Sequence, residues 1–106
     1  MTDQTSELLY MRAKLRLPGG VNSAVRAYQA VGRTPRFIQS AKGSHITDVD
    51  GNEMIDYVCS WGPGILGHAD PRVIEKVKAA CEEGLTFGAP TEREVEMAEL
   101  LAQLVP

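Results

Sequence analysis

The sequence predicts a small α/β fold made of an amino-terminal helix, a short antiparallel β meander and two further helices. First, ten glycines and six prolines divide the 106 residues into short segments. Second, strand-forming residues between positions 36 and 58 are separated by two hairpin-turn signals. Third, two segments after position 70 combine helix-start signals with an apolar stripe of helical period. A chain of this length is expected to form one domain with a modest core.

The first helix is predicted from Asp3 to Leu17, where apolar residues recur with an imperfect helical period. Pro18-Gly19-Gly20 ends it. The segment from Val21 to Pro35 has no clean period, and its own propensity for regular structure is weak. We therefore expect tertiary contacts or a ligand to hold this segment.

The meander is predicted from Arg36 to Val58. Its turns fall at Lys42-Gly43 and at Asp50-Gly51-Asn52, where glycine supplies the positive φ that tight hairpin turns need. A glycine-rich loop from Cys59 to His68 follows.

The last two helices have clear boundaries. The first starts with Asp70 as N-cap and Pro71 at the first helical position, and Gly84 ends it. Thr91 and Glu94 have the spacing of a capping box and start the second. The apolar residues expected to face the core are Val73, Ile74, Val77 and Cys81, and then Val95, Ala98, Leu101 and Val105. Because the chain stops at Pro106 directly after an apolar run, we expect it to be part of a longer protein.

The composition excludes several classes of function. A net charge of -3 does not provide a basic surface for nucleic acid or for an anionic membrane. No apolar run approaches the roughly 20 residues that span a bilayer. The polar and acidic start, Met1 to Tyr10, is neither a secretory signal nor a transit peptide.

Metal and phosphate motifs are incomplete. Asp48, Asp50 and Asn52 resemble a calcium loop, but Gly51 falls at position four and Cys59 stands at position twelve, where such loops need an acid. A hairpin turn with acidic caps is the better interpretation. No glycine-rich phosphate-binding fingerprint is present.

The two cysteines, Cys59 and Cys81, are interpreted as free thiols in a reducing cytosol, with a disulfide left open. Together with His68 they lack the paired close spacing of zinc ligands.

A binding site for a carboxylate is predicted at Asn22, Ser23 and Arg26. A guanidinium group can hold a carboxylate with two parallel hydrogen bonds, and serine and asparagine side chains add further ones. Trp61, beside three glycines, offers a flat ring wall for a planar ligand. The alternatives are that Arg26 is a surface cation and that Trp61 anchors the core.

Six blocks of sequence carry a family resemblance that covers nearly the whole chain from Leu15 onward. They are Pro18–Tyr28, Asp48–Asn52, Asp56–Val58, Ser60–Pro63, Gly67-His68 and Phe87–Thr91. In this order and spacing they resemble the opening of the glutamate-1-semialdehyde 2,1-aminomutases, within the class III aminotransferases. The G-G-V-N-S-x-V-R and F-G-A-P-T blocks separate these aminomutases from the related transaminases. One departure is Ala24, where the family usually has proline.

The resemblance implies a pyridoxal-phosphate transferase of fold type I, cytoplasmic and homodimeric, of which this chain is the amino-terminal quarter. Residues 1–90 would belong to the small domain, and residues 91–106 would form the first helix leading into the large cofactor-binding domain. The Schiff-base lysine and the cofactor-binding groups would lie beyond Pro106, so no catalytic or cofactor-binding residue is expected here and the chain alone is expected to be inactive. The lysines present, which match no family motif, are Lys14, Lys42, Lys76 and Lys78.

The implied reaction converts glutamate 1-semialdehyde to 5-aminolevulinate in tetrapyrrole (porphyrin) biosynthesis, with pyridoxal 5'-phosphate. Ser23 and Arg26 match family positions that hold the substrate carboxylate, and Trp61 matches a position lining the active site. Two other functions remain open: another class III aminotransferase, and a non-catalytic domain used for assembly.

Overall fold

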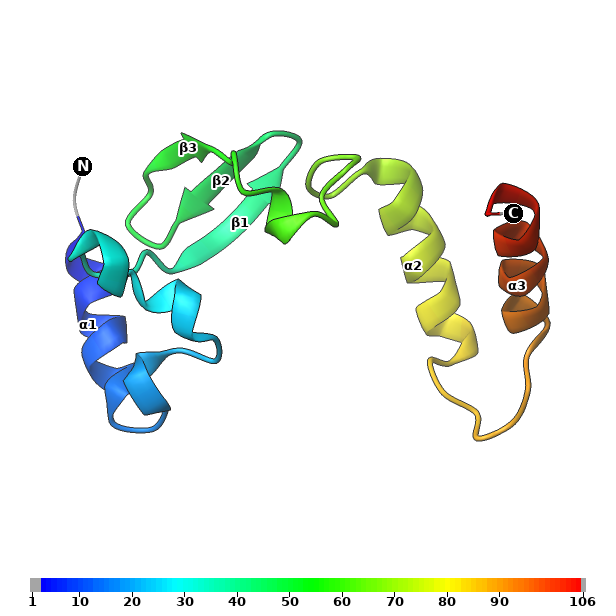
Figure 1. Cartoon of the computed structure of the whole chain (residues 1–106), viewed down its shortest axis with the longest axis horizontal. Coiled ribbons are helices and arrows are strands. Elements are labelled where there is room, and N and C mark those ends of the chain that lie inside the picture. The colour runs from blue at the N-terminus through cyan, green and yellow to red at the C-terminus, as the bar shows by residue number, and fades with distance from the viewer. Residues whose placement is uncertain (1–2, 106) are drawn as a thin grey trace. The chain divides into compact units, whose positions relative to one another are not determined.

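A computed structural model describes residues 3–105 of the chain. The chain divides into two compact units, one up to Pro71 and one from Arg72 onward. The first unit holds the helix α1 (Gln4–Lys14), the strands β1 (Ile38–Lys42), β2 (His45–Asp48) and β3 (Glu53–Ile55), and four short 3₁₀ turns (Figure 1). The predicted order of helix, meander and two helices is confirmed.

The start of α1 is held by a residue far away in the sequence. Asp3 occupies the N-cap position but makes no side-chain capping bond. Instead, Asp50 accepts hydrogen bonds from the backbone amides of Thr5 (2.6 Å) and Ser6 (2.9 Å). Burial alone would raise the pKa of Asp50, but the hydrogen bonds from the Ser6 and Thr5 amides outweigh burial and lower the pKa to about 2. The β2–β3 turn therefore caps α1.

The end of α1 differs from the prediction, at Lys14 rather than Leu17. The amides of Leu15 and Arg16 bond to carbonyls three residues back, at 3.2 and 2.9 Å, which tightens the last turn and ends the α-helix. The 3₁₀ turn Pro18–Gly20 follows, and the aperiodic segment after it contains two more, Ala24–Ala27 and Gln29–Val31.

Close packing joins α1 to the first of these turns. The buried Gly20 has a φ of 75°, and a Cβ there would lie 2.5 Å from the ring of Tyr10. The Tyr10 hydroxyl also donates to the carbonyl of Gly19 at 3.3 Å. Only glycine fits at position 20, because both the backbone conformation and the lack of space exclude a side chain.

The sheet is the predicted antiparallel meander, with strand order β1-β2-β3. Lys42 pairs with His45 across the first turn, and His45 pairs with Ile55 of β3. Gly43 (φ 56°) and Gly51 (φ 81°) occupy the two turns, as predicted from their positive-φ requirement.

A fully buried carboxylate organises the second turn. Asp48 accepts hydrogen bonds from Arg36 Nη1 at 2.6 Å, from the amide of Asn52 at 2.8 Å and from the Asn52 side chain at 2.9 Å. Burial would raise the pKa of Asp48, but the bonds from Asn52 and Arg36 lower it overall. The carboxylates of Asp48 and Asp50 both accept hydrogen bonds from the protein, Asp48 within the turn and Asp50 from the start of α1. The predicted hairpin turn with acidic caps is therefore confirmed.

The second unit contains α3 (Glu92–Leu104) and all of α2 (Pro71–Glu83) except its first residue. The start at Pro71, the stop before Gly84 (φ 111°) and the start after Thr91 agree with the prediction. The capping box itself is not formed, since the Thr91 side chain makes no capping bond. The amide of Glu94 donates instead to the backbone carbonyl of Thr91, at 3.3 Å.

The prediction of a modest core is wrong for this chain. Among residues 3–105, the buried apolar side chains are Ala27, at 4% exposed, and Pro35. The predicted core-facing residues of α2 and α3 are exposed, because these two helices make almost no contact with each other. The apolar stripes on both helices are therefore unpartnered within the second unit.

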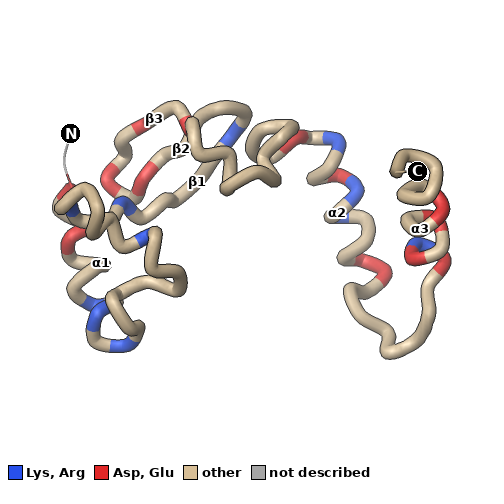
Figure 2. The backbone as a smooth tube through the Cα atoms, in the orientation of Figure 1, with Lys and Arg blue, Asp and Glu red and all other residues tan. Residues whose placement is uncertain are grey.

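In the second unit, α2 carries both cationic and acidic side chains and ends in Glu82 and Glu83, whereas α3 is mostly acidic (Figure 2). Within the described part of the chain, no helix combines the length and apolar character needed to cross a membrane.

Candidate functional site

The predicted site residues Ser23, Arg26 and Trp61 line one shallow pocket of about 240 Å³ in the first unit, together with Val25. Ser23 precedes the 3₁₀ turn Ala24–Ala27 that contains Arg26, and Trp61 comes from a separate turn. The amide of Arg26 donates to the carbonyl of Ser23 at 3.0 Å, which keeps these two residues on one short turn. The structure therefore brings together residues that are distant in the sequence.

The exposure of the pocket residues suits a binding surface more than a core. Trp61 is 73% exposed, so it does not anchor a core in this chain. Arg26 is exposed, and its guanidinium makes no hydrogen bond or ion pair with any side chain among residues 3–105. Asn22, the third residue of the predicted carboxylate site, is exposed and does not line this pocket.

The turn that carries Trp61 is left-handed. Three consecutive residues other than glycine have positive φ: Cys59 (49°), Ser60 (55°) and Trp61 (63°). This region is unfavourable for residues with a Cβ, and such conformations persist only where surrounding contacts hold them. The backbone closes the turn through bonds from the amides of Trp61 to Val58 (3.0 Å) and of Gly62 to Cys59 (3.1 Å).

Asp56 and His68 support this turn, a role that was not predicted from the sequence. One oxygen of Asp56 accepts from the amides of Val58 (2.9 Å) and Cys59 (3.1 Å), and the other lies 2.6 Å from His68 Nε2. The pKa of Asp56 is lowered, first by the bond from His68 and then by the bond from the Val58 amide. The available signal was an aspartate two residues before a turn, a pattern in which aspartate binds backbone amides.

A second pocket of the first unit, about 360 Å³, is lined in part by Ser44, Asp56, Cys59 and His68. Cys59 and Cys81 are both exposed free thiols. Among residues 3–105, no group of three or more His, Cys, Asp or Glu side chains could hold a metal ion.

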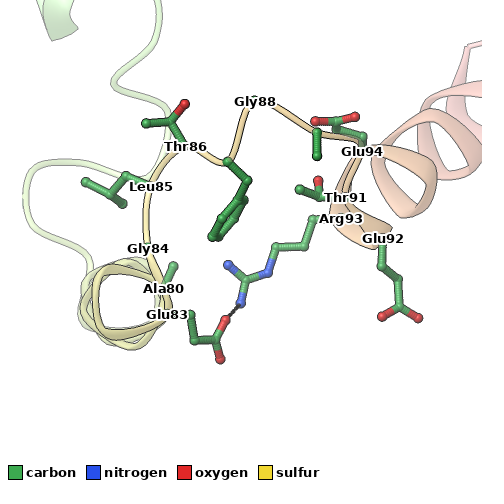
Figure 3. A pocket seen from close by; sticks show the side chains of 12 residues that line it. Ala80, Glu83, Gly84, Leu85, Thr86, Gly88, Thr91, Glu92, Arg93 and Glu94 are labelled. Carbon is green, nitrogen blue, oxygen red and sulfur yellow. Dashed lines mark hydrogen bonds and ion pairs between the residues drawn. The ribbon is translucent and has the colours of Figure 1, made fainter.

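In the second unit, a pocket of about 810 Å³ lies between the end of α2 and the start of α3 (Figure 3). Part of the F-G-A-P-T block lines it, and Arg93 reaches across it to form an ion pair with Glu83. Both side chains are more than half exposed, so this ion pair is a surface contact.

The lysines of the chain do not fit a covalent attachment site for a cofactor. All four, Lys14, Lys42, Lys76 and Lys78, are exposed. Lys14 lies with its Nζ 4.8 Å from the centre of the Tyr10 ring, where it packs on the surface of α1. A lysine that forms a Schiff base is activated by removal from water or by a neighbouring cation, and none of these positions is removed from water.

The fold and the motifs define a piece of a pyridoxal-phosphate transferase. The family model described as "Aminotransferase class-III" matches residues 27–106, and the chain belongs to this family. A solved structure titled "Transaminase with PLP bound" is 41% identical, with a TM-score of 0.87 over 97% of this chain and 24% of the other. A glutamate-1-semialdehyde aminomutase from Pseudomonas aeruginosa PAO1 is 25% identical, with a TM-score of 0.83 over 94% of this chain and 22% of the other. The predicted fold class is confirmed.

Within this family, the chain is similar to curated aminomutases. The glutamate-1-semialdehyde 2,1-aminomutase of Acetivibrio thermocellus is 61% identical over 106 residues, which are 100% of this chain and 25% of the relative. The resemblance predicted from the sequence blocks is confirmed. The chain spans about a quarter of the length of the curated relatives it matches.

Proposed function

We propose that this chain is the amino-terminal part of a glutamate-1-semialdehyde 2,1-aminomutase. The whole protein would convert glutamate 1-semialdehyde to 5-aminolevulinate in tetrapyrrole biosynthesis. The observation that carries the proposal is the convergence of Ser23, Arg26 and Trp61 on one pocket. The identity of 61% to a curated aminomutase over the whole chain supports it.

The pocket has the chemistry that the substrate requires. Glutamate 1-semialdehyde carries a carboxylate, and the guanidinium of Arg26 has no competing partner among the described side chains. A planar guanidinium can hold a carboxylate with two parallel hydrogen bonds, and the Ser23 hydroxyl adds a third. The indole of Trp61 forms a flat apolar wall beside these polar groups. The role of these residues is to bind and orient the substrate.

Pyridoxal phosphate would supply the amino group and the electron sink of the reaction. The described residues do not fit its covalent attachment, since all four lysines are exposed. We propose that the groups that bind it belong to the remainder of the protein.

We also propose how the chain is divided between the two domains of the whole protein. Residues 1–90 would belong to its small domain and residues 91–106 would begin its large domain. The apolar stripes of α2 and α3 are exposed, which supports the proposal that other parts of the whole protein pack against them. We propose that the whole protein is a cytoplasmic homodimer.

A chimera tests the function. Residues 1–106 of this chain would be joined to the remaining three quarters of the Acetivibrio thermocellus relative, loaded with pyridoxal phosphate and given glutamate 1-semialdehyde. We expect 5-aminolevulinate to form without an added amino donor, and none to form with the 106-residue chain alone. A folded, cofactor-loaded chimera that produces no 5-aminolevulinate would contradict the proposal.

The second candidate is another class III aminotransferase, which the 41% identity to a transaminase structure favours. A transaminase requires a separate amino donor and acceptor, whereas an aminomutase uses one substrate. Turnover of the chimera only in the presence of a second amino compound would select the transaminase. If the chimera binds cofactor but turns over neither substrate type, residues 1–106 serve assembly alone.

A further inference from the structure

We infer that Asp56 and His68 are positioning residues for Trp61, holding the left-handed turn that presents the indole to the pocket of Ser23 and Arg26. The inference rests on the proposed function for the identity of the substrate, while its geometry stands on the structure alone. Asp56 and His68 would act without touching the substrate, since neither of them lines that pocket.

The conformation of the turn requires external support. Cys59, Ser60 and Trp61 all have positive φ, between 49° and 63°, although none of them is glycine. The region is sparsely populated for residues with a Cβ. Three such residues in succession persist only if neighbouring groups hold the backbone, and strained turns of this kind are concentrated at binding sites.

Asp56 provides this support at the start of the turn. Its Oδ1 accepts hydrogen bonds from the amide of Val58 (2.9 Å), which precedes the left-handed segment, and from the amide of Cys59 (3.1 Å), the first residue of that segment. The carbonyl of Val58 in turn accepts the amide of Trp61 at 3.0 Å. Val58 therefore links the Asp56 carboxylate directly to the backbone of Trp61.

His68 fixes the carboxylate from the other side. Its Nε2 lies 2.6 Å from Asp56 Oδ2, so both oxygens of Asp56 are engaged. The pair is largely buried, with the side chains of Asp56 and His68 10% and 24% exposed, whereas Trp61 is 73% exposed. A hydrogen bond to an ionised group in such a sheltered place is stronger than one between neutral groups.

Both residues are anchored to the same hairpin. The backbone of His68 exchanges two hydrogen bonds of 2.8 Å with Gly43, and the amide of Asp56 donates to the carbonyl of Ser44 at 2.8 Å. A Cβ at Gly67 would lie 2.9 Å from the carbonyl oxygen of Gly43, so this approach requires glycine. The β1–β2 turn thus holds Asp56 and His68 in place, and these two residues hold the turn that contains Trp61.

The test uses the chimera with 5-fluorotryptophan incorporated, in which the ¹⁹F resonance of Trp61 is assigned by its loss in Trp61→Phe. In His68→Ala we expect this resonance to shift or broaden, and the KM for glutamate 1-semialdehyde to rise roughly tenfold with kcat changed far less. His68→Gln retains an N–H that can donate to Asp56 and should restore most of both readouts. In Asp56→Asn, the shift of the Trp61 resonance and the rise in KM should be smaller than in Asp56→Ala. The reason is that the asparagine oxygen can still accept hydrogen bonds from the amides of Val58 and Cys59.

His45→Ala is the matched control, since His45 is an exposed histidine on β2 whose ring Nδ1 lies 3.1 Å from the Ser44 hydroxyl oxygen. It should leave both the resonance and KM unchanged. An unchanged Trp61 resonance in folded His68→Ala, or equal effects of His68→Ala and His68→Gln, would overturn the inference. If the parent chimera forms no 5-aminolevulinate, the proposed function fails, while the resonance still decides whether the pair holds the turn.

Discussion

Two arginines of the first unit differ in what surrounds the guanidinium group. Arg36 is 13% exposed and pairs with Asp48 at 2.6 Å and with Asp3 at 2.9 Å. Arg26 is exposed, lines the pocket of Ser23 and Trp61, and pairs with no described side chain. A buried pair contributes to the fold, because removing one partner leaves a buried charge without compensation. An arginine without a partner at a pocket is available to a ligand.

Replacing Arg26 is therefore expected to affect substrate binding more than folding. In the chimera, Arg26→Ala should weaken apparent substrate affinity roughly ten- to a hundredfold, since a charge-assisted hydrogen bond contributes about 1.5–3 kcal/mol. Arg26→Lys should recover part of the loss, because it keeps the charge but not the two parallel donors. Steady-state kinetics and thermal melts measure both effects.

Arg36→Ala is the control for this experiment, and it should lower the melting temperature. If Arg26→Ala melts far below the parent while the folded molecules keep normal substrate affinity, Arg26 is a structural residue. Ser23 would then lose the basis for its assignment as well.

At the scale of elements, the attachment of α1 depends on contacts that span long stretches of sequence. Asp50 caps its first turn from the β2–β3 hairpin, and Tyr10 packs against Gly20 at the beginning of the segment that carries Ser23 and Arg26. The helix has Asp3 at its own N-cap position, yet this residue makes no capping bond. Hence α1 is held in place by the sheet and the glycine turn.

The Asp50 cap should make the stability of α1 dependent on pH. The pKa of Asp50 is about 2 in the folded chain, below the ordinary value of 3.8. A lowered folded-state pKa contributes stability that is fully present above the unfolded-state value and is lost as pH falls toward the folded-state value. Asp50→Asn in the chimera should therefore melt below the parent at pH 7, and the gap should narrow between about pH 4 and pH 2.

Hydrogen exchange at the amides of Thr5 and Ser6 shows whether the loss of stability arises at this cap. These two amides should exchange faster in Asp50→Asn than in the parent at neutral pH. A constant gap in melting temperature from pH 7 to pH 3 would show that the charge of Asp50 does not hold the helix.

The glycine pair beside Tyr10 offers a second test at this scale. Gly19 and Gly20 have similar positive φ, 68° and 75°, but a Cβ at Gly19 meets nothing within 4 Å whereas one at Gly20 lies 2.5 Å from the Tyr10 ring. Gly19→Ala should cost about 1–2 kcal/mol from backbone conformation. Gly20→Ala should cost roughly 1–3 kcal/mol more, because the Tyr10 ring must move. Equal unfolding free energies in denaturant titrations of the two variants would contradict the packing of α1 against this turn.

At the scale of the whole molecule, most of the large hydrophobic side chains among residues 3–105 are exposed. Ala27 and Pro35 are the buried apolar side chains among residues 3–105. Leu100, Leu101, Leu104 and Val105 at the end of α3 are between 49% and 69% exposed. Soluble monomers rarely expose such contiguous apolar surface, which is typical of interfaces.

The isolated chain is accordingly expected to self-associate or aggregate. Size-exclusion chromatography with light scattering should show species larger than the monomer, and Leu101→Glu combined with Leu104→Lys should reduce them, since charges interrupt the apolar stripe. Glu99→Gln, on the same helix, is the control and should not reduce association. A sharp monomer peak with a cooperative melt of the unmodified chain would contradict this expectation.

Features that depend on neighbouring residues could be predicted from the sequence. The meander, the turns at Gly43 and Gly51, and the helix boundaries at Pro71, Gly84 and Thr91 all follow from local conformational preferences. The family blocks could also be identified, because they are continuous in the chain. Ser23, Arg26 and Trp61 were candidates by residue type and resemblance, although nothing in their spacing showed that they would meet.

Features that depend on the folded path of the chain could not be predicted. Asp50 caps a helix that precedes it by more than forty residues, and His68 reaches back to Asp56 and Gly43. The helical stripes predicted a core, but periodicity reports only which residues share a face and not whether another element covers that face. Local preference is set by the backbone and adjacent side chains, whereas these hydrogen bonds and the burial of each face exist only after distant segments meet.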